Sequence, residues 1–286
     1  MTPALWGALT SVSWGTSDYI ARFSGRAITS QAATFGMLLT GSILLSLWVW
    51  IAQAPVRLPL AGLWLILVSG VSLTAATLWL YQSIVRGPIS IAEPIVGSYP
   101  VLIVLYSLIE GVRPSSLQWA AMVVTLIGVA FVAVSAGHFV EEGVRTLRDL
   151  RITIVIAAAS SLAYAIGIIA AQRAIPLYGE LQTTWLTRLV SLAALLLLFV
   201  GRRRAPRIPA RWWPAVAAQG ALDSGGFLSL YQVGYDNGAE LAAVAASTYA
   251  VVTILLAWIF LREAIRPRQW LGIALTFGGV AVLSLR

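Results

Sequence analysis

Runs of apolar residues, each as long as a membrane-spanning helix, alternate with short polar joints along the whole chain. A helix needs about 20 mostly apolar residues to cross the hydrocarbon core of a bilayer. Ten runs reach this length, at residues 3–23, 31–52, 60–85, 90–109, 116–136, 152–172, 181–200, 212–235, 239–261 and 268–285. The joints contain proline, glycine and arginine, which end helices or remain at the membrane surface. The pattern predicts an all-α integral membrane protein with ten transmembrane helices.

Short motifs of the first half recur in the second half. Leu80-Tyr81-Gln82 recurs 150 positions later as Leu230-Tyr231-Gln232, and Gln118-Trp119 recurs 151 positions later as Gln269-Trp270. Weak internal similarity of this kind is typical of transporter folds that are built from repeats. Because each half has an odd number of spans, the second copy begins on the opposite side of the membrane. We therefore expect two inverted five-helix repeats.

The longest polar joint lies between these repeats. It covers residues 137–151 and contains two glutamates, one aspartate and three arginines. We predict a first repeat at residues 1–136, a cytoplasmic linker at 137–151 and a second repeat at 152–286. Both halves of the pseudo-dimer are then present in one chain, so we expect a monomer.

Composition excludes several classes of protein. The 286 residues are 59% hydrophobic and 10% charged, with a mean hydropathy of +0.86, whereas about 25% charged residues is usual in soluble domains. The chain has no cysteine, which excludes disulfides and thiolate metal sites. The net charge of +8 comes from arginines that lie singly or in short clusters between apolar runs, a distribution that argues against nucleic-acid binding. We expect no cofactor and no metal.

The distribution of arginine predicts an orientation. The first, third, fifth, seventh and ninth connections contain 14 arginines, whereas the even connections and the two tails together contain four. Cytoplasmic loops carry the excess of positive charge. We expect a multi-pass protein of the cell (inner) membrane with both termini outside the cytoplasm.

Charged residues inside the predicted spans are candidates for function, because an ionised group at the bilayer centre costs on the order of 3 kcal/mol. Asp223 lies midway along 212–235, where it either holds helices together or binds a proton or a cation alternately with substrate. Glu93 lies near the start of 90–109 and is either a carboxylate stabilised in a first helical turn or a coupling residue. Arg188 either extends to the membrane surface or pairs with Asp223 or a substrate carboxylate.

Asp18 and Arg22 are four residues apart in the first span, the spacing of a helical ion pair. We expect them to pair locally near the cytoplasmic surface. Coupling to protons is therefore assigned to Asp223 and Glu93.

Aromatic and glutamine side chains also lie within the spans, and several recur in both halves. Each can be a packing residue, but buried Tyr and Gln need hydrogen-bond partners, and their repetition is what a pseudo-symmetric central cavity requires. The predicted substrate-binding set is Trp14, Trp79, Tyr81, Gln82, Tyr99, Tyr164, Trp185, Arg188, Asp223, Tyr231, Gln232 and Tyr249.

Three motifs resemble a known family. Phe260-Leu261-Arg262-Glu263, the stretch Pro267-Arg268-Gln269-Trp270-Leu271-Gly272, and Ser13-Trp14-Gly15-Thr16-Ser17-Asp18 are similar to motifs of the EamA-type ten-helix members of the drug/metabolite transporter superfamily. The first half departs from the pattern, because Arg113 stands at the position that matches Glu263. The resemblance implies a carrier in which helices one to four and six to nine surround the cavity. It leaves the cargo open.

The combined reading is a secondary active transporter, most simply an exporter of small metabolites such as amino acids. No Walker A motif is present, so uphill transport would depend on an ion gradient, and we expect protons. A lipid-carrier flippase, a facilitative carrier of the same fold and a passive channel are alternatives. An intramembrane enzyme would need a nucleophile with a base or a carboxylate cluster at membrane depth, and no such motif is present.

Overall fold

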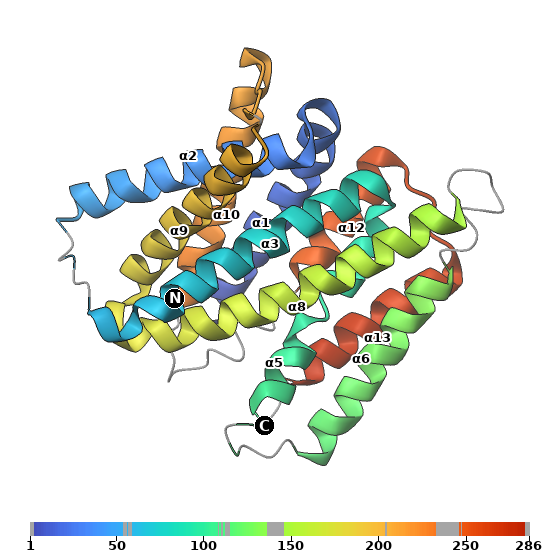
Figure 1. The fold of residues 1–286 in the computed structure, drawn as a ribbon. Coiled ribbons are helices and arrows are strands. Elements are labelled where there is room, and N and C mark those ends of the chain that lie inside the picture. Colours follow the sequence, from blue (N-terminus) through green and yellow to red (C-terminus); the bar gives the residue numbers. More distant parts are fainter. Residues whose placement is uncertain are drawn as a thin grey trace.

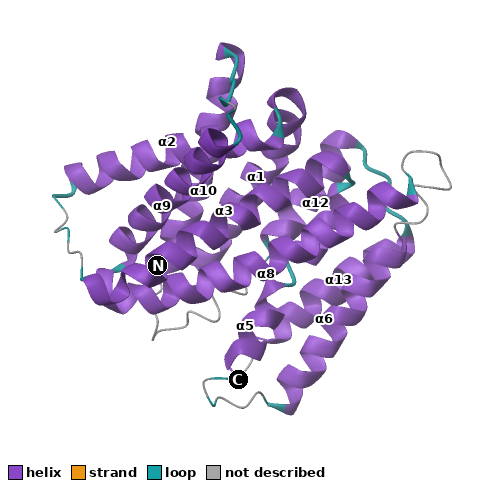
Figure 2. Ribbon diagram, viewed as in Figure 1, coloured by secondary structure: helices purple, strands orange, loops and turns teal. Residues whose placement is uncertain are grey.

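The computed structural model describes residues 3–53, 56, 59–107, 109, 111, 115–135, 146–203, 205–232, 246 and 248–283, and the regular elements in these ranges are helices (Figure 1 and Figure 2). The prediction of an all-α protein is confirmed. The described helices fall at the positions of the predicted apolar runs.

The described part of the first half contains six helices and one short 3-10 turn. They are α1 (Pro3–Ile28), α2 (Ser30–Ile51), η1 (Leu60–Gly62), α3 (Leu63–Arg86), α4 (Ile89–Val96), α5 (Tyr99–Ser107) and α6 (Ser116–Ser135). The second half contains α8 (Leu147–Tyr178), α9 (Glu180–Gly201), η2 (Ala210–Trp212), α10 (Trp213–Tyr231), α12 (Tyr249–Leu261) and α13 (Pro267–Leu283).

Five stretches of the described chain are long and apolar enough to cross a membrane. They are Ser30–Ile51, Leu60–Arg86, Ile89–Tyr106, Leu147–Tyr178 and Glu180–Gly201, and the shorter helical segments Ser116–Val132 and Tyr249–Leu261 are also apolar. Large apolar side chains are exposed on the outer surface, such as Trp50 at 76% and Leu197 at 72%. In water such a surface would aggregate, but in a bilayer it faces lipid.

The structure interrupts one of the predicted runs and extends others, as at α1, which ends at Ile28 instead of residue 23. The span expected at 90–109 is interrupted between α4 and α5 at Gly97 and Ser98. Pro100 has no backbone N–H to donate, so the helix is not continued through this point. The span expected to begin at residue 152 begins at Leu147, where the Thr146 side chain accepts a hydrogen bond from the Asp149 backbone N–H and caps α8.

The contacts between the two halves are pseudo-symmetric: a helix of the first half and its counterpart in the second half pack on equivalent helices of the opposite half. Helix α3 packs on α8 and α9, and its counterpart α10 packs on α1 and α2. Likewise α5 contacts α8 and its counterpart α12 contacts α1, while α2 contacts its counterpart α9 and α6 contacts its counterpart α13. The helices of each half therefore pack largely against helices of the other half.

Helices α6 and α13 lie side by side at one end of the molecule (Figure 1). A Cβ atom at Gly128 would lie 2.5 Å from the Thr276 backbone nitrogen, and one at Gly272 would lie 2.9 Å from the Gly128 carbonyl oxygen. Glycine is needed at both positions because the two backbones approach so closely. Small residues drive helix association in membranes, where apolar burial contributes little.

Candidate functional site

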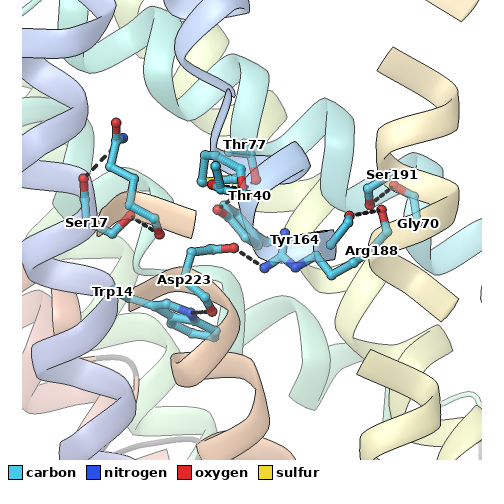
Figure 3. Close-up of polar contacts among 12 residues, drawn as sticks. Trp14, Ser17, Thr40, Gly70, Thr77, Tyr164, Arg188, Ser191 and Asp223 are labelled. Atoms are coloured by element: carbon cyan, nitrogen blue, oxygen red, sulfur yellow. Dashed lines mark hydrogen bonds and ion pairs between the residues drawn. The ribbon is translucent and has the colours of Figure 1, made fainter. Parts of the chain in front are cut away.

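An ion pair joins α9 and α10 in the interior of the helix assembly. The Arg188 guanidinium contacts the Asp223 carboxylate, and the two residues are 3% and 8% exposed (Figure 3). The guanidinium also lies over the Phe227 ring, 4.5 Å from its centroid. Charge pairing and a cation–π contact together compensate the desolvation of this arginine.

A small cavity lies beside this pair. Its lining comes from five helices and consists of Trp14, Asp18, Tyr99, Tyr164, Asp223 and Tyr249. Its volume is about 10 Å³, which is room for about one water molecule. The structure is therefore closed around the site, and a larger ligand requires the surrounding helices to separate.

The four aromatic residues of the cavity form two pairs related by the internal repeat. Trp14 and Tyr164 are 150 positions apart, as are Tyr99 and Tyr249. The ring contacts repeat in the same way: Trp14 lies 5.7 Å from Tyr249, and Tyr164 lies 6.1 Å from Tyr99, between ring centroids. The aromatic wall of the cavity is thus pseudo-symmetric.

The charged residues do not follow this symmetry. The positions that correspond to Asp18, Asp223 and Arg188 under the 150-residue displacement are Ile168, Leu73 and Leu38. These three counterparts are buried and apolar. The fold accepts an apolar residue at each of these places, so the charges are not required by the architecture itself.

Asp18 does not form the local pair that its spacing from Arg22 predicts. Arg22 instead donates a hydrogen bond of 2.5 Å from its guanidinium to the Gly87 carbonyl oxygen, which joins α1 to the end of α3. Asp18 is 7% exposed and faces the cavity. The local prediction failed because spacing along one helix does not reveal which neighbouring helix a side chain meets.

Glu93 lies in α4, and its side chain is fully buried. Neither carboxylate oxygen has a hydrogen-bond partner among the described residues. Glu93 does not line the cavity. A buried carboxyl group without a partner is costly to keep ionised, which makes it a candidate for proton binding.

The backbone of α10 lies close to the Trp14 indole ring of α1. The Trp14 indole N–H donates to the Asp223 carbonyl oxygen at 3.3 Å (Figure 3). A Cβ at Gly226 would lie 2.5 Å from the Trp14 indole nitrogen, so glycine is required there, whereas a Cβ at Gly225 would have no neighbour within 4 Å. Gly226 therefore allows Trp14 to reach the cavity and Asp223.

Gln219 was missed in the predicted set. It is fully buried in α10, accepts a hydrogen bond from the Ser24 hydroxyl at 2.9 Å and donates to the Tyr81 hydroxyl at 3.1 Å. Its position four residues before Asp223, inside an apolar span, was an available signal, because residues four apart share a helix face. Gln219 thereby connects α1 and α3 with the helix that carries Asp223.

The other predicted residues are divided between the interior and the outer surface. Tyr81 donates to the Met37 sulfur at 3.0 Å, and the Trp185 indole N–H donates to the Ser46 hydroxyl at 2.9 Å. Tyr231 is buried against the Phe227 ring, with 5.8 Å between centroids. Tyr81 and Trp185 thus join helices, whereas Tyr231 packs within α10, and none of the three lines the cavity.

Three further members of the predicted set lie away from the cavity lining. Trp79 is 38% exposed on α3, Gln82 is half-buried, and Gln232 is exposed at the end of α10. In this conformation the repeated pair Gln82 and Gln232 does not line the cavity, whereas the repeated pair Tyr99 and Tyr249 does.

Glu263 connects the two halves near the broken span. Its carboxylate accepts hydrogen bonds from the backbone N–H groups of Ile89 and Ser90, at 3.3 and 3.2 Å, and from the Ser90 hydroxyl at 2.6 Å. The Gln269 amide donates to the Ser90 carbonyl oxygen at 3.1 Å. The connection before α13 thus caps the N-terminus of α4, the helix that carries Glu93.

Comparison with known proteins assigns the chain to a family. The model of the EamA-like transporter family matches residues 1–134 and again residues 151–285. A solved crystal structure, described only as that of a protein, has a similar fold with a TM-score of 0.69 and 19% sequence identity, over 98% of this chain and 94% of the other. A search of curated proteins found no significant match. Because the family model accounts for nearly the whole chain in two repeats, this multi-pass membrane protein belongs to the EamA-like transporter family.

Proposed function

We propose that this protein is a secondary active transporter that exports small metabolites such as amino acids by alternating access, driven by exchange with protons. The observation that carries the proposal is the buried Arg188–Asp223 pair beside a closed cavity where the two halves meet. Charged residues are retained inside a membrane assembly when they bind a substrate or an ion.

The pseudo-symmetric contacts supply a route for alternating access. Each half packs on the other through equivalent helix pairs, and in transporters with inverted repeats the substrate site lies at such a boundary. Opening one set of contacts while its counterpart stays closed would expose the cavity to one side of the membrane at a time. The closed cavity would then be an occluded state between the two open ones.

Asp223 and Glu93 are the proposed coupling residues. Asp223 can exchange its Arg188 contact for a proton or for a cationic group of the substrate. Glu93 is fully buried with no hydrogen-bond partner in the described part of the chain, so its ionisation state responds to any rearrangement that admits water. We further propose a monomer in the cell membrane with both termini outside the cytoplasm.

Transport by purified protein in proteoliposomes tests this proposal. A labelled panel of amino acids and amines is followed with and without an imposed pH gradient, and we expect movement of at least one compound that the gradient accelerates. Asp223→Asn and Glu93→Gln should each abolish the response to the gradient. Glu180→Gln, a carboxylate-to-amide change at the start of α9, is the matched control and should leave transport unchanged.

The possible outcomes separate the parts of the proposal. Transport that ignores the gradient would identify a facilitative carrier. Undiminished gradient-driven transport by Asp223→Asn would make Asp223 a structural carboxylate and leave coupling to Glu93. No movement of any compound by folded protein would count against transport of small metabolites.

A further inference from the structure

The cavity contains one carboxylate that the protein does not neutralise. Of its two acidic residues, Asp223 is paired with Arg188. The Asp18 carboxylate is buried, faces the cavity, and has neither a hydrogen bond nor an ion pair within the described ranges of the chain. The guanidinium nearest to it along the helix, that of Arg22, donates to the Gly87 carbonyl.

The surroundings of Asp18 disfavour an anionic ligand. Arg188 is already held between the Asp223 carboxylate and the face of the Phe227 ring. A ligand carboxylate that displaced Asp223 would leave two unpaired carboxylates in the cavity. The lining and its ion pair contain two carboxylates, those of Asp18 and Asp223, and one guanidinium, that of Arg188.

The remaining lining is suited to a cation. Trp14 contacts Tyr249, and Tyr99 contacts Tyr164, and all four line the cavity. Electron-rich ring faces attract an ammonium group, and a desolvated cage of aromatic rings is a general solution for binding organic cations. The same region already holds one cation over an aromatic ring, namely Arg188 over Phe227.

We propose that this cavity binds organic ammonium ions, with the cationic nitrogen against the Asp18 carboxylate and enclosed by Trp14, Tyr99, Tyr164 and Tyr249. This inference rests on the proposed transport function and names its substrate class. The aromatic cage follows the internal symmetry and Asp18 breaks it, so the cation is expected to lie nearer to α1 than to the equivalent position in α8, where Ile168 stands. Admission of the ligand requires the two aromatic pairs to move apart.

Calorimetric titration of the whole chain in detergent, at mildly alkaline pH to favour the ionised form of Asp18, tests the proposal. The probes share one ring and differ in charge: benzyltrimethylammonium, phenethylamine, phenylalanine and 3-phenylpropionate. We expect the first two to bind, phenylalanine to bind no more tightly than phenethylamine, and phenylpropionate not to bind. Asp18→Asn should weaken the binding of benzyltrimethylammonium on the order of tenfold or more, because it removes the charge and keeps the shape.

Two variants control for structural damage. Asp18→Glu retains the charge and should retain cation binding, and Glu180→Gln removes a carboxylate that does not line the cavity and should have no effect. Binding of phenylpropionate as tight as that of the cations would overturn the proposal. So would unchanged affinity in Asp18→Asn, or an absence of cation binding by folded wild-type protein.

Failure of this inference is distinguishable from failure of the proposed function. Protein that moves zwitterions or anions in proteoliposomes but binds none of the cations is still a transporter, with a different substrate class. Protein that binds the cations but moves no compound retains the cation site and loses the proposed transport.

Discussion

The Arg188 guanidinium in α9 and the Asp223 carboxylate in α10 form a buried ion pair, whereas the positions equivalent to them in the other half of the chain are Leu38 and Leu73. One fold therefore contains the same structural location twice, once charged and once apolar. Because Leu38 and Leu73 are accepted at the equivalent positions, the fold does not require charges there, and we attribute the Arg188–Asp223 charges to the function of the site.

Removal of one partner of this pair should destabilise the protein more than removal of both. Asp223→Leu or Arg188→Leu alone leaves an uncompensated buried charge, and we expect a loss of about 3 kcal/mol in unfolding free energy. The double variant reproduces the apolar pair of the other half and should recover most of this loss while abolishing transport. Thermal unfolding in detergent, combined with the proteoliposome assay, measures both. Additive losses in the double-mutant cycle would contradict a direct interaction.

Gln219 should contribute to stability through its hydrogen bonds to α1 and α3. Gln219→Ala leaves the Ser24 hydroxyl without its acceptor and removes the hydrogen bond that the side-chain amide donates to the Tyr81 hydroxyl. We therefore expect the unfolding free energy to fall by about 1–2 kcal/mol. Gln172→Ala, at a half-buried position in α8, is the matched control and should change stability by less than about 0.5 kcal/mol. Equal melting temperatures for the two variants would show that the Gln219 bonds contribute nothing.

Sequence reasoning predicted an all-α chain of two repeats, because long apolar runs and recurring motifs can be read from the sequence. The tyrosines at 99 and 249 recur at a fixed displacement, and both line the cavity. Trp79 belongs to the same predicted set, but it is 38% exposed and does not line the cavity. In a membrane span the lipid-facing side is as apolar as the interior, so hydropathy does not identify the buried face of a helix. The direction of Asp18 depends on how α1 crosses its neighbours, which no local spacing encodes.

Two adjacent glycines of α13 should respond oppositely to the same substitution. A Cβ at Gly279 would lie 2.8 Å from the Ala121 carbonyl oxygen, whereas one at Gly278 would meet no described atom within 4 Å. Gly279→Ala should therefore destabilise the α6–α13 contact by about 1–3 kcal/mol. Gly278→Ala should be neutral or stabilising by up to about 1 kcal/mol, because alanine favours a helix over glycine. Thermal unfolding of the two variants tests this prediction. Equal shifts in melting temperature would show that close backbone packing at Gly279 does not determine the effect.

The absence of cysteine allows the membrane orientation to be measured with one introduced thiol at a time. Val56 and Ala205 are exposed and lie in the connections before α3 and α10, which are equivalent connections of the two halves. In inverted repeats, equivalent connections must open on opposite sides of the membrane. The arginine bias further places Ala205 in the cytoplasm and Val56 outside.

A membrane-impermeant maleimide should label Val56→Cys in intact cells and label Ala205→Cys only after the cells are lysed. The wild-type chain, without any thiol, gives the background. Labelling of Ala205→Cys alone in intact cells would reverse the orientation and preserve the inversion, because the two sites would still lie on opposite sides. Labelling of both sites, or of neither, in intact cells would place equivalent connections on one side of the membrane. That result would overturn the inverted repeat, and with it the proposed route for alternating access.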